Sequence, residues 1–365
     1  MTEIPLPAGA TLRPLELPAR ADAAPSPRLR EYAEVRNQCI VEATGRADDA
    51  LSIEALQPRL FSTPDRVRCQ WYIESEGHIV GCCALDILQD DGGQTAMGTV
   101  TVLRSHQGHG IASAAFEHVE RVARDAGVQK MLGWSEHHDD GSGLPMLPSP
   151  TGFGSVPADR SARFLSRHGF TLEQVERASA LVWDAATIAH LERLRDDALA
   201  HAAHYRAVQW EIPTPAERMS GYAWLKSRMS TDAPDADMGT PEETWDAARV
   251  TQQDERVAAG GWTMRVTAAE HVSTGELCAF NELAIGSEPA ATTHQWDTLV
   301  LREHRGHRLG MLVKTVGLLS WHEPYPDSPR VITYNAEENR PMLSINEAIG
   351  FTPVAYEGAW KKVLT

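Results

Sequence analysis

The stretch Arg104-Ser105-His106-Gln107-Gly108-His109-Gly110-Ile111-Ala112 decides the fold. It follows Thr99–Leu103, which predicts a β-strand, and it leads into Ile111–Ala126, where apolar residues recur at helical spacing. A loop between a strand and a helix N-terminus presents successive backbone N–H groups to an anion. Gly110 allows close approach of a phosphate, and Ala112 keeps the first helical turn small. The stretch therefore predicts a phosphate-binding loop, with an ordinary tight turn as the alternative.

The chain contains this arrangement twice. His106-Gln107-Gly108-His109 matches His304-Arg305-Gly306-His307, which lies 198 positions later between a second predicted strand and helix. Another pair of landmarks, Gly169-Phe170 and Gly350-Phe351, is 181 positions apart. The difference of 17 equals the length of Gly141–Pro157, whose composition is typical of a loop. We infer an internal repeat with an insertion in its first copy.

The repeat predicts two domains. A length of 365 residues suffices for two domains of ordinary size. We expect a first domain over residues 1–185, a linker over 186–215 and a second domain over 216–365. Residues 1–184 and residues 185–365 each carry 17 basic and 25 acidic residues, so the two halves contribute equally to the net charge of −16. In the second domain, Thr240, Pro241 and Glu243 form the pattern of a capping box at a helix N-terminus.

Composition and charge exclude several classes of protein. The acidic excess argues against a general nucleic-acid-binding protein, which would carry a basic one. No apolar run approaches the roughly 18 residues that a membrane span needs. The N-terminus lacks the pattern of a signal peptide, and the five cysteines include no CxxC spacing. These features predict a reduced, cytoplasmic protein with no membrane partner.

With these motifs the chain resembles the GNAT superfamily of acyl-CoA-dependent acyltransferases, whose pyrophosphate loop reads [QR]-x-x-G-x-[GA]. Gln107–Ala112 matches that signature, and Arg305–Gly310 matches it except that Arg308 stands where the family has glycine. The family's later helix, which ends in Gly-Phe, is similar to Ser161–Phe170 and Met342–Phe351. The resemblance occurs twice and covers nearly the whole chain. In this respect the chain is similar to tandem actinobacterial members of the mycothiol synthase type.

The resemblance implies an α/β (α+β) fold with two tandem GNAT-like domains. Each would be a mixed, mostly antiparallel central sheet flanked by helices, with acetyl-CoA lying where the sheet splits. Matching the family residue by residue gives the expected acetyl-CoA contacts: Val102, Leu103, Gln107, Gly108, His109, Gly110, Ile111 and Ala112 in the first half, and Val300, Leu301, Arg305, Gly306, His307, Arg308, Leu309, Gly310 and Asn339 in the second.

The family's chemistry is direct transfer, in which a base deprotonates an ammonium and the free amine attacks the thioester. The second half offers Glu282, His294 and Asp297 as candidate catalytic residues. The first half offers Asp86, with Glu136 and His137 after its later strand. The family's usual acid, a tyrosine four residues before Gly-Phe, is replaced by Leu165 in the first half and by Asn346 in the second.

We therefore expect an acetyl-CoA-dependent N-acetyltransferase that acts on a small-molecule amine, with one active and one degenerate domain. A protein or peptide acceptor is one alternative, and a non-catalytic acyl-CoA-binding sensor or structural protein is another. No metal is expected, because the HxxH spacings at 106/109 and 304/307 have no carboxylate-bearing helix beside them. The sequence leaves open whether the protein is a monomer or a homodimer.

Overall fold

A computed structural model describes residues 3–137 and 143–364. The chain forms two compact units: unit 1 comprises Met1–Val175, Asp235–Pro241 and Tyr356–Thr365, and unit 2 comprises Glu176–Pro234 and Glu242–Ala355. The units thus differ from a simple division of the chain into halves. The last strand returns to unit 1, and the residues expected to form a linker provide a helix and a strand of unit 2.

Unit 1 is built on a mixed sheet in the order β1-β2-β3-β4-β5-β6-β15. All neighbours in this sheet are antiparallel except β5 and β6, which are parallel. The strands are β1 (Ile4–Pro5), β2 (Thr11–Pro14), β3 (Arg66–Ser75), β4 (His78–Leu88), β5 (Thr95–Val102), β6 (Lys130–His137) and the part of β15 (Thr352–Val363) that begins at Tyr356. The helices are η1 (Pro7–Gly9), α1 (Pro27–Thr44), α2 (Ile53–Leu56), η2 (Gln57–Leu60), η3 (Arg104–His106), α3 (Ile111–Asp125) and α4 (Arg160–Arg167).

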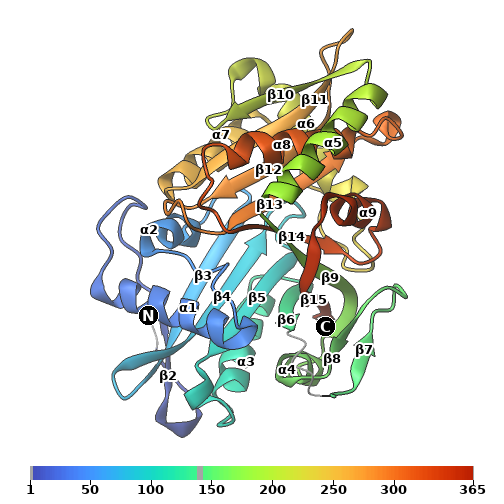
Figure 1. Cartoon of the computed structure of the whole chain (residues 1–365). Coiled ribbons are helices and arrows are strands. Elements are labelled where there is room, and N and C mark those ends of the chain that lie inside the picture. Colours follow the sequence, from blue (N-terminus) through green and yellow to red (C-terminus); the bar gives the residue numbers. More distant parts are fainter. Residues whose placement is uncertain (1–2, 138–142, 365) are drawn as a thin grey trace. The chain divides into compact units, whose positions relative to one another are not determined.

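Helices cover both faces of this sheet, because β4 is apolar on both sides. One face packs against α3, where Phe116 and Val119 join Leu85 in the core. The other face meets α1, whose Tyr32 carbonyl lies 3.8 Å from the Cys82 sulfur. Figure 1 shows α1 crossing the strands of unit 1. The interior of unit 1 is therefore a conventional apolar core.

Unit 2 repeats the plan, with the sheet order β9-β14-β13-β12-β11-β10. Here β13 and β14 form the parallel pair, and the other neighbours are antiparallel. The strands are β10 (Tyr205–Glu211), β11 (Thr263–His271), β12 (Leu277–Ile285), β13 (Thr293–Val300), β14 (Arg330–Ala336) and the part of β9 (Thr171–Val182) that begins at Glu176. The helices are α5 (Ala185–His201), α6 (Ala216–Asp232), α7 (Ala247–Ala259), η4 (Arg302–His304), α8 (Leu309–His322) and α9 (Arg340–Ile349).

Opposite faces of the unit 2 sheet meet α6 and α8. Tyr222 of α6 packs edge-on against Phe280 of β12. Gly317 of α8 lies over the next residue of that strand, Asn281, where a Cβ would come within 3.3 Å of the side-chain nitrogen. Figure 1 shows α5 beside α8, and Leu191 and Ala198 of α5 are buried in the core that α8 supplies.

The structure confirms the expected fold class, a mixed and mostly antiparallel sheet with flanking helices. One predicted helix start is wrong, because α7 begins at Ala247 with Asp246 as its capping residue. The predicted capping box does not form, because the Glu243 side chain and the Thr240 backbone have other hydrogen-bond partners. Glu243 accepts the indole N–H of Trp245, and the Thr240 amide donates to Asp235. The described part of the predicted insertion, residues 143–157, forms a small hairpin, β7 (Met146–Pro148) with β8 (Ser155–Pro157); Gly141 and Ser142 lie outside the described residues.

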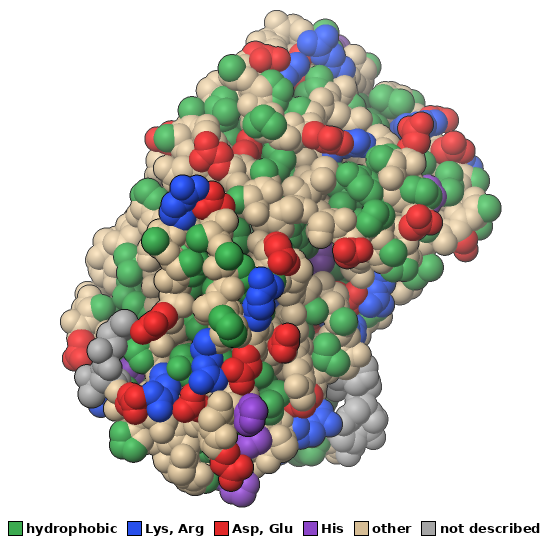
Figure 2. Space-filling view, turned by 90° about the vertical axis from the view of Figure 1, so that its left-hand side faces the viewer, with side chains coloured by type: hydrophobic (Ala, Val, Ile, Leu, Met, Phe, Trp, Pro, Cys, Tyr) green, Lys and Arg blue, Asp and Glu red, His purple; other side chains and the backbone are tan. Residues whose placement is uncertain are grey.

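The surface reflects the mixed charge of the sequence. On the face drawn in Figure 2, acidic and basic side chains are interspersed. None of the helices in residues 3–137 and 143–364 has the length and apolar character required of a membrane span.

Helix α8 carries an unusual buried amine. The Lys314 side chain is inaccessible to solvent, and its Nζ has no hydrogen-bond partner among the described residues. Burial lowers the pKa of this amine to about 7. The corresponding helix of unit 1 has Phe116 at this position, 198 residues earlier, packed edge-on against Phe164 and Phe170. Lys314 therefore destabilises the fold relative to an apolar side chain at the same position.

We expect Lys314→Met to stabilise unit 2, by about 1–3 kcal/mol near neutral pH, because it removes an unpaired buried polar group. Between about pH 7 and about pH 10 the unfolded chain binds a proton at Lys314 that the folded chain does not bind. This group therefore makes wild-type stability rise with pH, by at most about 1.4 kcal/mol per pH unit. Urea unfolding at several pH values measures the effect, and a constant stability difference between variant and wild type would contradict it.

Candidate active site

The loop in unit 1 has the geometry of an anion cradle. Gly108 and Gly110 adopt left-handed φ values of 89° and 80°, and Gly110 is the N-cap of α3 without a side-chain capping bond. The first N–H groups of α3 therefore receive no side-chain partner from the N-cap. Gln107 holds the loop in place, since its Nε2 donates to the Val102 carbonyl over 2.8 Å. Ile111 is buried beneath the exposed residues 108–110.

The loop in unit 2 repeats this geometry with different residues. Arg305 takes the place of Gln107, and its Nε donates to the Val300 carbonyl over 3.2 Å. Gly306 has φ of 86°, and Arg308 has a left-handed φ of 56° at the position where Gly110 of unit 1 has φ of 80°. The Arg308 guanidinium pairs with Asp197 of α5. Arginine thus preserves the shape of the cradle at the cost of backbone strain.

In each unit the parallel strands before the loop separate. Strands β5 and β6 pair from Thr95↔Lys130 to Met97↔Leu132, and in the described part of the chain their pairing stops there. Strands β13 and β14 pair only at Thr293↔Val331 and His294↔Ile332. The loop-proximal ends of β5 and β13, including Val102 and Val300, therefore lie where the parallel strands have parted. This is the split that the sequence resemblance implied.

Among the described residues, a β-bulge at this split is present in unit 2 and absent from unit 1. Strands β4 and β5 of unit 1 pair in uninterrupted register from Gly81↔Val102 to Ile87↔Ala96. In unit 2 the register of β12 against β13 shifts between Asn281↔Thr298 and Leu283↔Gln295. Trp296 and Asp297 therefore both lie opposite Glu282. A bulge bends a strand and redirects its side chains, and bulges are over-represented beside active sites.

The bulge brings Asp297 into a buried ionic network with Glu282. Lys226 of α6 donates to Glu282 Oε1 over 3.1 Å and also to Asp297 Oδ2, while the Tyr222 hydroxyl donates to the same Glu282 oxygen. The ammonium of Lys226 also lies 5.0 Å from the ring centroid of Trp245. Two of the three predicted catalytic residues thus meet through a lysine that the sequence analysis did not identify.

Burial sets the electrostatics of this network. Burial raises the pKa of Glu282 above its ordinary value, although the neighbouring Lys226 opposes the shift. Burial alone disfavours the charge on Lys226, but Asp297 and Glu282 outweigh it and raise the pKa of the ammonium. Among the described residues, Glu282 Oε2 has no hydrogen-bond partner. The Glu282 side chain is 1% exposed and that of Asp297 is 35% exposed, so Asp297 is the carboxylate that solvent reaches.

The third predicted residue, His294, has aromatic neighbours. Its ring lies edge-on to Trp262 with 5.4 Å between centroids, and Trp262 also stacks on Trp296. Two further positions taken from the family are asparagines: Asn339 matches the family, and Asn346 replaces its tyrosine. Asn339 precedes α9 without a capping bond from its side chain. Asn346, in the place of the usual tyrosine, is buried and donates to Asn335 over 2.7 Å.

Unit 1 has a tyrosine and an arginine at the helix spacing of Tyr222 and Lys226, and it lacks the two acids of the network. Tyr32 and Arg36 of α1 have the same four-residue spacing as Tyr222 and Lys226 of α6. Counting from the matched pairs Gly81↔Val102 and Ala279↔Val300, Glu282 corresponds to Ala84 and Asp297 to Thr99. This spacing, repeated in both copies, is the sequence signal that would have identified Lys226.

The acids predicted for unit 1 serve other contacts. Asp86 pairs with Arg66 and Arg68, and Glu136 pairs with Arg46. His137 lies between the Ser135 hydroxyl, 2.7 Å from Nε2, and the Asp159 carboxylate, 2.8 Å from Nδ1. Ser135 in turn accepts the indole N–H of Trp360 in β15. This chain of hydrogen bonds connects β6 to the final strand and to the N-terminus of α4.

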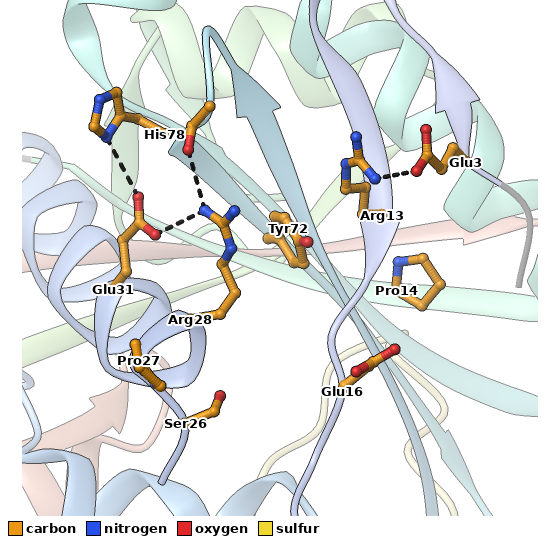
Figure 3. A pocket seen from close by; sticks show the side chains of 11 residues that line it. Glu3, Arg13, Pro14, Glu16, Ser26, Pro27, Arg28, Glu31, Tyr72 and His78 are labelled. Carbon is orange, nitrogen blue, oxygen red and sulfur yellow. Dashed lines mark hydrogen bonds and ion pairs between the residues drawn. The ribbon is translucent and has the colours of Figure 1, made fainter.

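A separate cavity of about 820 Å³ lies in unit 1, lined by the start of α1, by β2 and by the turn between β3 and β4. Figure 3 shows Glu31 between Arg28 and His78, with Arg13 and Glu3 opposite. Opposite charges are already paired there, and none of the lining residues belongs to the loop Gln107–Ala112. We therefore assign the candidate site to the loops and strand split, and not to this cavity.

Comparison with known proteins agrees with this geometry. Residues 31–142 match the acetyltransferase (GNAT) family. No curated protein matches the chain. Solved structures with a similar fold include a tandem GNAT protein from the clavulanic acid biosynthesis pathway (24% identity, 97% of this chain and 98% of that one, TM-score 0.72), a GCN5-related N-acetyltransferase from Sphaerobacter thermophilus (14%, 95% and 97%, 0.57) and a GCN5-related glucosamine N-acetyltransferase region of a fungal multi-domain β-N-acetylglucosaminidase (13%, 97% and 38%, 0.55).

The chain thus has the fold of a tandem GNAT protein over nearly its whole length. In sequence, residues 31–142 are similar to the acetyltransferase (GNAT) family. The narrower likeness to the mycothiol synthase type stays a prediction.

The strain at Arg308 predicts a stability difference between two variants. Arg308→Gly and Arg308→Ala both remove the ion pair with Asp197, but only glycine adopts left-handed φ without steric cost. We expect the glycine variant to be the more stable of the two by about 1 kcal/mol. Urea unfolding of both variants measures this, and equal stability would show that the left-handed conformation carries no strain.

Proposed function

We propose that the protein is an acetyl-CoA-dependent N-acetyltransferase for a small-molecule amine, with catalysis in unit 2 and a degenerate site in unit 1. The observation that carries this proposal is the difference between the two splits. Unit 2 has the bulge and places Asp297 and Glu282 beside it, whereas unit 1 has Thr99 and Ala84 at those positions.

The residues present fit acetyl-CoA, which supplies the acetyl group as a thioester. In both units a helix N-terminus without a capping side chain follows a loop with left-handed residues, which suits a pyrophosphate. In unit 2 the amide groups of Arg305–Gly310 would hold the phosphates, and Val300 and Leu301 would offer backbone groups to the pantetheine arm. Asn339 and the other matched residues of both loops remain proposed contacts.

We assign the binding and deprotonation of the acceptor amine to Asp297. Its partly exposed carboxylate attracts a cationic acceptor and takes the ammonium proton, so that the neutral amine is the attacking species. Glu282 acts indirectly. It shares Lys226 with Asp297 and so fixes the position of the Lys226 ammonium between the two carboxylates. His294 is the third candidate from the sequence, and its contact with Trp262 places it among aromatic side chains that could border the acceptor.

Two other functions remain as outcomes of the test. A peptide or protein acceptor would leave the same carboxylates in use. A non-catalytic acyl-CoA sensor would bind the donor without turnover, and the absence of tyrosine at positions 165 and 346 favours it.

The first test replaces the proposed catalytic carboxylate. We expect Asp297→Asn to lower kcat by about 10²–10⁴-fold, because asparagine has nearly the same shape as aspartate but does not accept the proton. Thr99→Asn is the matched control at the corresponding position of unit 1, and it should leave kcat unchanged. Release of free thiol from acetyl-CoA, measured over a panel of small amines and peptides, gives the rates. Turnover with peptides alone would shift the proposal to that acceptor, and binding without any turnover would establish the sensor.

The second test adds a negative charge beside each phosphate cradle. His109 and His307 are exposed loop residues at matching positions, and neither has a left-handed φ. A glutamate there repels the phosphates, so we expect His307→Glu to weaken kcat/KM for acetyl-CoA about tenfold at low salt and less at high salt. His109→Glu should leave turnover unchanged. Equal loss of kcat/KM in both variants would show that catalysis is not confined to unit 2.

A further inference from the structure

A cluster of metal-ligand side chains lies at the base of the unit 2 loop. Glu276 immediately precedes β12, Cys278 is the second residue of that strand, and His304 is the last residue of η4. Their donor atoms all lie within 4.8 Å of one another, and His304 Nε2 is 3.8 Å from Glu276 Oε2. The ligand atoms of a tetrahedral ion with bonds of about 2.0–2.3 Å are nearly this close, so small side-chain adjustments would suffice.

Neighbouring groups orient this cluster. The Tyr205 hydroxyl lies 2.9 Å from His304 Nδ1, which leaves Nε2 facing Glu276. A hydrogen bond to the second ring nitrogen is the usual support of a metal-ligating histidine. The ring of His271 lies 6.1 Å from that of His304, and the ring of His307 lies 5.4 Å from that of Tyr205. Imidazoles thus gather around a thiol and a carboxylate.

The chemistry of the donors selects the ion. Thiolate and imidazole are ligands for Zn²⁺ and similar transition-metal ions, and they do not suit Mg²⁺ or Ca²⁺. The Cys278 thiol is buried and donates to the Glu276 carbonyl over 3.4 Å, and burial raises its pKa to about 11. Ligation therefore breaks the S–H bond, forms a sulfur–metal bond and releases the proton to solvent. Glu276 is exposed and gives the ion its access.

We propose that Glu276, Cys278 and His304 form a binding site for one Zn²⁺-like divalent ion, with water in the fourth position. The bound ion joins the start of β12 to η4, which leads directly into Arg305–Gly310. It therefore restrains the loop and adds positive charge beside the proposed phosphate cradle. The sequence predicted no metal because His304 was considered with His307, whereas the structure supplies the other ligands from Cys278 of β12 and from Glu276 just before that strand.

The matching positions of unit 1 lack this set of ligands, which provides matched controls. The positions 198 residues earlier hold His78, Val80 and His106, so neither the carboxylate nor the thiol is present. His106 lies at the same place in its loop, where its Nδ1 is 2.9 Å from the Ser105 hydroxyl. Cys69 is a second, half-buried thiol outside the cluster.

The test uses the full chain, freed of metal with a chelator under reducing conditions and titrated with Co²⁺ and then Zn²⁺. We expect one equivalent of Co²⁺ to give tetrahedral visible bands and a thiolate-to-cobalt charge-transfer band, both displaced by one equivalent of Zn²⁺. Cys278→Ser should abolish the charge-transfer band, whereas Cys69→Ser and His106→Gln should retain it. Tyr205→Phe should weaken Co²⁺ binding about tenfold, as expected for a group that supports a ligand.

Two results of the Co²⁺ titration would overturn the proposal. One is the absence of a charge-transfer band in the wild-type chain, and the other is an undiminished band in Cys278→Ser, which would mean binding elsewhere. Glu276→Gln changes an exposed residue and so addresses folding, because the variant should unfold at the wild-type temperature without metal and lose the Zn²⁺-dependent rise in Tm. A retained rise would also contradict the proposed ligand set. None of these readouts depends on acetyl transfer.

Discussion

Each unit depends on one constraint, a pair of parallel strands that pair for two or three residues and then separate. Pairing at the start of β13 and β14 fixes their relative position, and separation leaves the end of β13 without a strand neighbour on that side. The loop must then turn into a helix whose N-terminus faces this region, which accounts for the left-handed residues 306 and 308. The candidate phosphate cradle and strand split are thus consequences of a sheet that does not continue.

The two units use this common frame differently. Unit 1 has an apolar core in which Phe116 packs with two other phenylalanine rings, and its sheet has regular register between β4 and β5. Unit 2 has a bulge and a buried ionic network, and at the position of Phe116 it has the unpaired Lys314. Buried polar groups cost stability unless they are paired. Their concentration in unit 2 is what we expect of the half in which function opposed optimal packing.

The sequence predicted the parts of this fold that depend on local pattern. Gln107–Ala112 and Arg305–Gly310 have the expected conformation because glycine spacing and helical periodicity are local properties. The catalytic role of the candidate residues stays a prediction. The structure brings Glu282 and Asp297 together through Lys226, which lies more than 50 residues earlier on α6. The bulge and the Glu276–Cys278–His304 cluster depend on strand register and on long-range approach. No residue pattern reveals these, and the capping box at Thr240 failed because tertiary partners competed for its groups.

The path of the chain also has a consequence for synthesis. Strand β6 of unit 1 pairs along its length with Tyr356–Val363, which follow all of unit 2 in the sequence and are translated after it. Unit 1 therefore cannot complete its sheet while the ribosome is still making unit 2, and until then the edge of β6 is open to pairing with another chain. The order of translation and the order of folding are thus reversed, and the first copy of the repeat is the last to close. A fragment that ends near residue 185 would carry this open edge permanently.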